Sequence, residues 1–259
     1  MSKLSAIFNN NKAFIPFIVA GDPDKGTTLA NIRALDKGGA DIIELGIPFS
    51  DPVADGPVIQ AADVRAFKGG ISVAEIFDIV AEARKFTKTP IVFLTYANIP
   101  FRYGYDAFCA RCSELGVAGL VIPDLPHEEQ GEILPSATKY GVDIINLITL
   151  TSGDRVPMLA RNAQGFIYVV SSEGVTGTRE EFDQRLSKLL ADIHAQTDTP
   201  AAIGFGIHTP EQATAMAKIS DGVIVGSGIV DLVGKYGKDA PEHIESYVAS
   251  LKKATALAG

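Results

Sequence analysis

The chain is 259 residues long and 46% of its residues are hydrophobic, which excludes a disordered chain and leaves room for one large domain. Its 31 acidic residues outnumber its 23 lysines and arginines, and the net charge of −8 argues against binding to nucleic acid. The two cysteines, Cys109 and Cys112, are too few for a disulfide framework and are typical of a reducing compartment. We therefore expect a cytoplasmic protein whose partners are small molecules or other proteins.

The first apolar run, residues 13–21, has some features of a secretion signal, because it follows Lys3 and Lys12 and ends in small residues. The run contains Pro16, however, and continues into the polar turn at 22–26, which favours a buried strand that enters a loop. No apolar run approaches the roughly 18 residues of a membrane span. We expect neither export nor a membrane segment.

Eight short apolar runs recur along the chain with helix-like segments between them, which is the alternation of a parallel sheet covered by helices. Helices are expected at 72–85, 179–196 and 210–219. Eight such units close most economically into a single (β/α)8 barrel, with a doubly wound open sheet as the alternative. The expected strands are 13–20, 41–47, 90–96, 118–123, 143–150, 165–171, 200–207 and 222–225.

No change of composition divides the chain, so residues 1–259 are expected to form one barrel domain. Residues 2–11 are predicted to form an extra N-terminal helix that covers the bottom of the barrel. In a barrel, chemistry takes place at the C-terminal ends of the strands. The polar residues that follow each predicted strand are therefore the candidates for a functional site.

The second predicted strand carries a carboxylate. Alternation places Ile43, Leu45 and Ile47 on one face of the strand and Glu44 on the other. The bulky face suits the helical shell, so Glu44 is predicted to face the barrel interior. Burial raises the pKa of a carboxyl, and such a group can donate and accept a proton near neutral pH. The alternatives are a salt-bridged core residue and a strand register shifted by one residue.

The loop at 48–57 adds two carboxylates, Asp51 and Asp55. Asp55 can reach back over the barrel mouth, although most loop aspartates are turn or cap residues. Residues 43–56 read IELGIPFSDPVADG, and this segment closely resembles the signature of the tryptophan synthase alpha chain family. The resemblance extends along the chain and includes GDP at 21–23, YAN at 96–98 and PDLP at 123–126.

Three glycine-bearing segments follow the last three predicted strands, at 174–177, 204–206 and 226–228. A glycine after a strand is usually a turn residue, but successive backbone N–H groups can also form an anion cradle. Three such loops where barrels often hold phosphate favour a phosphate site. Glu173 would repel a phosphate, so its side chain is expected to point to solvent.

The resemblance implies cleavage of indole-3-glycerol phosphate to indole and glyceraldehyde 3-phosphate, with no cofactor in this chain. It implies that Glu44 moves protons and that Asp55 accepts a hydrogen bond from the indole N–H. The phosphate would be held by Gly177, Gly206, Gly226 and Ser227, and Thr176 would belong to a loop that closes over the ligand. The expected contacts of the indole ring are Phe17, Tyr96 and Phe205.

Other aldolase chemistries lack the residues they need. No predicted strand carries a lysine for a Schiff base, since Lys12 and Lys88 precede strands. The four histidines are scattered along the sequence, so no metal site is expected. Cys109 and Cys112 form a CxxC pattern within a helical segment, which indicates helix packing rather than redox or metal chemistry.

The resemblance also implies a partner, a beta chain that carries pyridoxal phosphate and consumes the indole, in an α2β2 heterotetramer. The beta chain is expected to contact the rim at 51–55 and the loop after Gly177. Two other functions stay open at this point. One is a different phosphate-binding barrel enzyme such as an isomerase, and the other is a non-catalytic barrel that binds a ligand and activates a partner.

Overall fold

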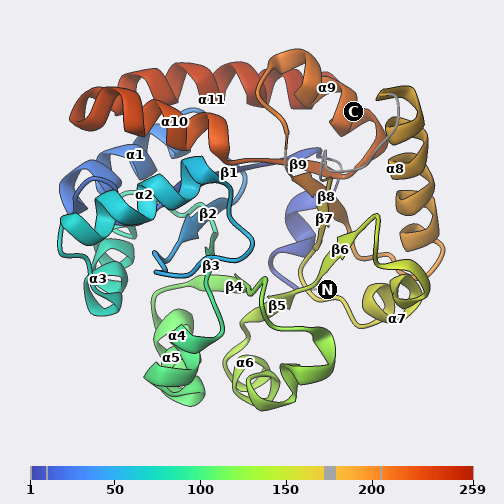
Figure 1. The fold of residues 1–259 in the computed structure, drawn as a ribbon, viewed down its shortest axis with the longest axis horizontal. Helices are drawn as coiled ribbons and strands as arrows, with labels where there is room; N and C mark the ends of the chain where they lie inside the picture. The colour runs from blue at the N-terminus through green and yellow to red at the C-terminus, as the bar shows by residue number, and fades with distance from the viewer. Residues whose placement is uncertain (1, 10, 172–178, 205, 259) are drawn as a thin grey trace.

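The computed structural model describes residues 2–9, 11–171, 179–204 and 206–258. Its strands form one parallel sheet in the order β5-β4-β3-β2-β1-β9-β8-β7-β6 (Figure 1). Only Asn146 separates β5 from β6 in the chain, so the two ends of this order are joined and the sheet curls into a nearly closed barrel. The strands are β1 (Ala13–Val19), β2 (Ile43–Gly46), β3 (Ile91–Leu94), β4 (Val117–Val121), β5 (Asp143–Ile145), β6 (Leu147–Thr149), β7 (Ile167–Val170), β8 (Ala201–Gly204) and β9 (Gly222–Val225).

Each of the eight predicted runs contains a strand, and the predicted barrel is confirmed. The run at 143–150 differs from the prediction, because it holds two short strands instead of one. β5 pairs with β4, whereas β6 pairs with β7. Between the two strands, the side chain of Asn146 donates to the carbonyl of Leu159 at 3.0 Å and accepts from Gln130 at 3.1 Å.

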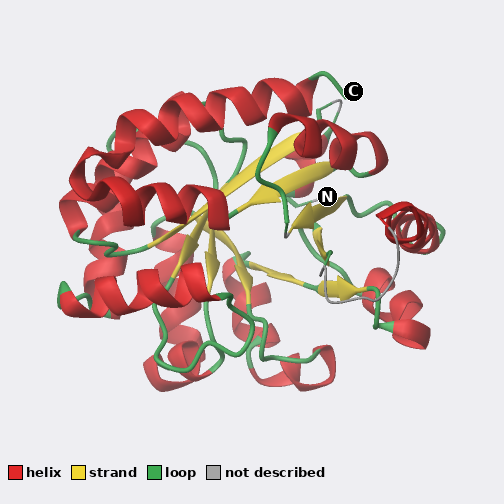
Figure 2. Cartoon of the chain, turned by 45° about the horizontal axis from the view of Figure 1, so that its top comes forward, coloured by secondary structure: helices red, strands yellow, loops and turns green. Residues whose placement is uncertain are grey.

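Helices surround the strands, as Figure 2 shows. The predicted helices at 72–85 and 210–219 correspond to α3 and α9, and both begin with a capping box, formed by Ser72 with Glu75 and by Thr209 with Gln212. The α-helices are α1 (Lys25–Lys37), α2 (Pro57–Lys68), α3 (Val73–Ala83), α4 (Asn98–Tyr103), α5 (Tyr105–Glu114), α6 (Leu134–Tyr140), α7 (Val156–Arg161), α8 (Arg179–His194), α9 (Pro210–Ile219), α10 (Ser227–Tyr236) and α11 (Ala240–Ala256). Short 3-10 helices are η1 (Ser5–Phe8), η2 (His127–Glu132), η3 (Gly153–Arg155) and η4 (Gly237–Asp239).

The two largest hydrophobic cores of the described residues lie on the two faces of the barrel wall. The larger core packs outward-facing strand residues such as Ile43 and Leu45 against the helices. The smaller core fills the barrel with inward-facing residues such as Ile42, Val92 and Ile224. This alternation confirms that the bulky face of the second strand points to the helical shell and that its other face points inward.

The N-terminal segment covers the bottom of the barrel with less helix than predicted. Of the described residues between 2 and 11, only Ser5–Phe8 are helical, and they form the 3-10 turn η1. Asparagines follow η1, and their side chains compete with helical backbone hydrogen bonds, which favours an early end to a helix. Leu4 and Phe8 are nevertheless buried in the inner core, so the segment closes the barrel at this end.

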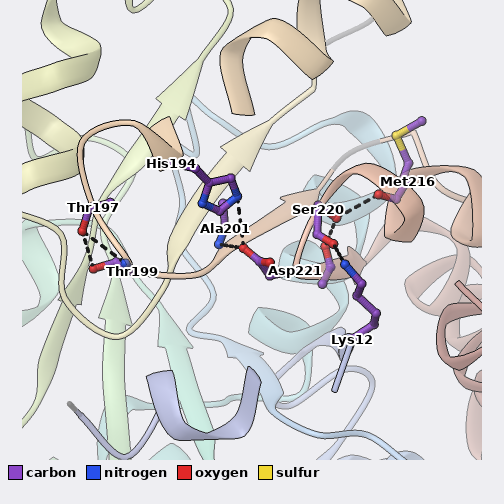
Figure 3. A network of polar contacts seen from close by, with 9 residues as sticks. Lys12, His194, Thr197, Thr199, Ala201, Met216, Ser220 and Asp221 are labelled. Atoms are coloured by element: carbon purple, nitrogen blue, oxygen red, sulfur yellow. Dashed lines mark hydrogen bonds and ion pairs between the residues drawn. The ribbon is translucent and has the colours of Figure 1, made fainter. Parts of the chain in front are cut away.

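Polar contacts join the N-terminal ends of β8, β9 and β1 (Figure 3). The Asp221 carboxylate accepts from the backbone N–H of Ala201 at 2.8 Å and lies 3.4 Å from a ring nitrogen of His194. Lys12 donates to the carbonyl of Ser220 at 2.7 Å, so it serves as a structural contact at the end opposite the strand C-termini. Within the described ranges, no helix is long and apolar enough to cross a lipid bilayer.

Candidate active site

A cavity of about 630 Å³ opens at the C-terminal ends of the strands. Its wall includes Glu44 from β2, Asp55 from the following loop, Phe17 from β1, and Gly226 with Ser227 after β9. The mouth of the barrel therefore brings together residues that lie more than 200 positions apart in the sequence. This is the place where barrels carry their chemistry.

Glu44 faces the cavity from inside the barrel wall and is almost completely buried. Neither of its carboxyl oxygens has a hydrogen-bond partner among the described residues. Burial, and to a smaller extent the charge of Asp55, raises the pKa of Glu44 to about 8. Glu44 therefore holds a proton at neutral pH and can give it to a bound molecule.

Asp55 lies in a more polar environment than Glu44. The Tyr96 hydroxyl donates to its carboxylate at 2.8 Å and accepts from the backbone N–H of Ala54 at 3.1 Å. The Tyr96 ring stacks on Phe49, with ring centroids 4.8 Å apart. Burial raises the pKa of Asp55, and the hydrogen bond from Tyr96 opposes this increase. The two carboxyls thus lie in different environments. The environment of Glu44 suits a proton donor, whereas that of Asp55 suits a base that stabilises a positive charge.

Two glycines make room for Phe17 in the cavity wall. A β-carbon on Gly46 would lie 2.7 Å from the end of the Phe17 ring, closer than such atoms approach, and one on Gly226 would lie 3.3 Å from the same ring. The glycines on either side of β1 therefore let an aromatic side chain lie at the mouth. Phe17 is placed where it can contact a flat apolar ligand.

The cavity wall also contains backbone suited to an anion. Gly206 has a φ of +73°, a conformation that favours glycine, and it lines the cavity. Gly226 caps α10, so the first backbone N–H groups of this helix lie beside Ser227 at the cavity wall. Helix N-termini of this kind bind phosphate groups.

Tyr96 does not belong to the described cavity wall, because its side chain is used to hold Asp55. Thr176, Gly177 and Phe205 lie outside the described residues, as does Glu173. Of the predicted site residues, the structure thus brings Phe17, Glu44, Asp55, Gly206, Gly226 and Ser227 to one cavity.

Sequence reasoning missed Tyr168 on β7. Its side chain is buried in the inner core and lines the cavity, and burial together with the charge of Glu44 raises its pKa well above the usual value. A β-carbon on Gly204 would come within 2.6 Å of its hydroxyl, so this glycine makes room for it. The signal was available, because alternation through the run at 165–171 places Tyr168 on the inner face.

The described parts of the chain offer no site for metal binding or for cysteine chemistry. No cluster of three or more histidine, cysteine or acidic side chains that could hold a metal ion occurs there. Cys109 and Cys112 are free thiols buried on α5 in the outer core. Burial raises the pKa of Cys109 to about 11, which suits packing and leaves the thiol unreactive.

A parallel barrel with a buried carboxyl at its C-terminal mouth, unpartnered among the described residues, is the arrangement of an α/β-barrel enzyme that uses acid–base chemistry. The family model of the tryptophan synthase alpha chain matches residues 4–258. The chain therefore belongs to the tryptophan synthase alpha chain family.

Similar proteins agree with this assignment. The tryptophan synthase alpha chain of Lacticaseibacillus casei is 63% identical over 254 residues, which cover 98% of this chain and 96% of that protein. The alpha chain of Lactiplantibacillus plantarum is 51% identical, with the same coverage. A chain of tryptophan synthase from M. tuberculosis, in an aminoacrylate-bound form, superposes with a TM-score of 0.88 at 31% identity, covering 98% of this chain and 100% of that chain.

Proposed function

We propose that Glu44 and Asp55 carry the chemistry of this lyase. As a member of its family, the chain is the subunit that cleaves indole-3-glycerol phosphate to indole and glyceraldehyde 3-phosphate in tryptophan biosynthesis. The observation that carries the residue assignment is the buried carboxyl of Glu44, which has no hydrogen-bond partner among the described residues and faces the same cavity as Asp55.

In the proposed reaction, Glu44 donates its proton to C3 of the indole ring. The ring nitrogen becomes positively charged, and Asp55 stabilises this charge through a hydrogen bond from the N–H. The Glu44 carboxylate then takes the proton of the side-chain hydroxyl next to the ring. The carbon–carbon bond breaks, its electron pair returns to the ring, and the hydroxyl carbon becomes an aldehyde. Glu44 ends protonated, ready for another cycle, and each proton transfer contributes roughly 10²- to 10⁴-fold to the rate.

Substrate binding fixes the geometry of this step. We assign the phosphate to Gly177, Gly206, Gly226 and Ser227, with Thr176 in the loop that closes over it. Phe17 and Phe205 are assigned to the indole ring, and Tyr96 contributes to the same end of the site through Asp55. Contacts with the remote phosphate hold the scissile bond near Glu44 and reduce the entropy cost of reaction.

Family membership implies a beta chain partner, and we propose an α2β2 assembly in which the partner carries pyridoxal phosphate. Indole is apolar and diffuses away easily, so joining the two sites retains it. Val53 and Phe101 support a partner surface near the mouth, because their side chains are 81% and 60% exposed although both are apolar. We further propose that the 259 residues form one domain and act in the cytoplasm.

The test of the residue assignment is indole release by purified variants. Glu44→Gln and Asp55→Asn should fold and bind the beta chain but release indole at least 100-fold more slowly, since each removes one carboxyl. Glu82→Gln, on the exposed face of α3, is the control and should keep wild-type activity. Unchanged indole release by Glu44→Gln would exclude it as the proton donor. A wild-type protein that releases no indole with its partner present would favour an isomerase or a non-catalytic activator.

A further inference from the structure

The cavity extends through the barrel wall. Val121, Ile145 and Leu147 belong to the inner core, whereas Ile122, Ile144 and Leu159 belong to the outer core, yet all six line the same cavity. The cavity therefore has one part inside the barrel, beside Glu44, and a second part outside the wall. We call the second part the outer lobe.

The split strand leaves a part of the barrel wall without strand pairing between these two parts. Pairing of β5 with β4 ends at Ile145 and Val121, and the chain then moves across to pair with β7 from Leu147 onward. In the described strand pairing, no residue of β6 pairs with β4. Gln130 and Asn146, which a buried hydrogen bond of 3.1 Å joins at this point, both line the cavity.

Helical turns cover the outer lobe. η2 contributes His127 and Gln130, and α7 contributes Leu159. At the mouth, the guanidinium of Arg155 donates to both carboxylate oxygens of Glu128, at 2.8 and 2.6 Å, and so joins η3 to η2. Both of these side chains are about half exposed, which places the ion pair at the solvent boundary.

The chemistry of the outer lobe selects a small apolar molecule with one polar atom. Its wall is largely aliphatic, with Ile122, Leu125, Ile144 and Leu159. Ring nitrogen Nδ1 of His127 is buried there and has no hydrogen-bond partner among the described residues. A buried polar atom of this kind is costly unless a ligand or water satisfies it.

Of the molecules in this reaction, indole fits the outer lobe and the phosphate-bearing ones do not. Indole is flat and apolar and has a single N–H, which can pair with the free nitrogen of His127. A phosphate would bring a negative charge against this aliphatic wall, and the nearby guanidinium of Arg155 is already paired with Glu128. We infer that the outer lobe is a second binding pocket for indole, reached from the reaction site through the part of the wall between β4 and β6 that lacks strand pairing.

The proposal that indole occupies the outer lobe rests on the proposed lyase function. The test therefore measures binding and does not depend on catalysis. The probe is 5-fluoroindole, titrated into the protein and followed by fluorine NMR, with and without saturating indole-3-propanol phosphate, which lacks the hydroxyl needed for cleavage. We expect two bound signals without the phosphate compound and one with it. A crystal soaked with 5-bromoindole in the presence of the phosphate compound should show bromine beside Leu159.

Variants then assign the remaining signal. Leu159→Phe fills the outer lobe and should weaken that binding at least 10-fold, whereas Met158→Phe, at the neighbouring position on α7, should not. His127→Ala keeps the lobe open but removes the nitrogen, and it should weaken binding several-fold if Leu159→Phe does not fold. The inference is wrong if the phosphate compound displaces all fluoroindole, if both lobe variants bind it normally, or if bromine appears only at crystal concentrations without binding in solution. Failure of the Glu44→Gln test alone would leave these binding results intact.

Discussion

Glu44 and Asp55 have the same functional group but different surroundings. Glu44 has no hydrogen-bond partner among the described residues and a pKa of about 8, whereas Asp55 accepts a hydrogen bond from Tyr96. The sequence could predict that Glu44 points inward, because strand alternation decides it. The role of Tyr96 could not be predicted, because the turn of the 48–57 loop determines which side chain meets Asp55.

The raised pKa of Glu44 makes stability depend on pH. Between pH 4.5, which is the ordinary pKa of the group, and about pH 8, the folded protein holds a proton on Glu44 that the unfolded chain has lost. The free energy of unfolding therefore falls as pH rises through this window, by up to about 1.4 kcal/mol per pH unit. Glu44→Gln has no such proton, so its stability advantage over wild type should increase from pH 5 to pH 8. Urea denaturation of both proteins across this range measures the difference, and parallel pH profiles would contradict the raised pKa.

Tyr96 is predicted to act through Asp55. Tyr96→Phe removes a hydrogen bond to a charged acceptor, worth about 1.5–3 kcal/mol, so kcat/KM should fall about 10- to 100-fold. Because this bond lowers the pKa of Asp55, the acidic limb of the pH–rate profile should move to higher pH. Tyr103→Phe, which changes a partly exposed tyrosine on α4, is the matched control. A wild-type pH profile for Tyr96→Phe would show that the bond does not position Asp55.

At the scale of elements, hydrophobic alternation and capping signals predicted the strands and several helix boundaries. α9 covers the predicted residues 210–219, and its capping box explains why. The break in the run at 143–150 was not predicted. Its cause is tertiary, since the Asn146 side chain bonds to Gln130 and to the Leu159 carbonyl, which are distant in sequence.

The capping box of α3 provides a test at this scale. Ser72 accepts from the backbone N–H of Glu75, and the Glu75 carboxylate accepts from the backbone N–H of Ser72. Ser72→Ala should lower the free energy of unfolding by about 1 kcal/mol without changing indole release. Glu75→Gln preserves the capping pattern and should lose much less. Equal losses in the two variants, measured by urea denaturation, would indicate a cause other than capping.

At the scale of the whole molecule, the barrel gathers the site from distant segments, and the sequence predicted this gathering because parallel strands end at one mouth. It did not predict the outer lobe, which depends on how the wall separates between β4 and β6. It did point to the rim at 51–55, which contains the exposed Val53, but it did not identify Phe101, because exposure is set by the folded surface.

The partner surface gives a prediction at this scale. Phe101→Asp places a charge on an apolar surface near the mouth and should weaken binding to a beta chain at least 10-fold. Leu257→Asp, at a C-terminal residue that is 72% exposed, should bind normally. Isothermal titration with the beta chain of the same tryptophan synthase measures both affinities. Equal affinities would remove Phe101 from the interface.

The most direct measurement is a crystal structure with bound indole-3-propanol phosphate. It should show the indole N–H within hydrogen-bond distance of Asp55, ring carbon C3 beside the Glu44 carboxyl, and the phosphate on the backbone of Gly206, Gly226 and Ser227. A phosphate bound elsewhere, or an indole ring whose C3 lies out of reach of Glu44, would contradict the proposed mechanism.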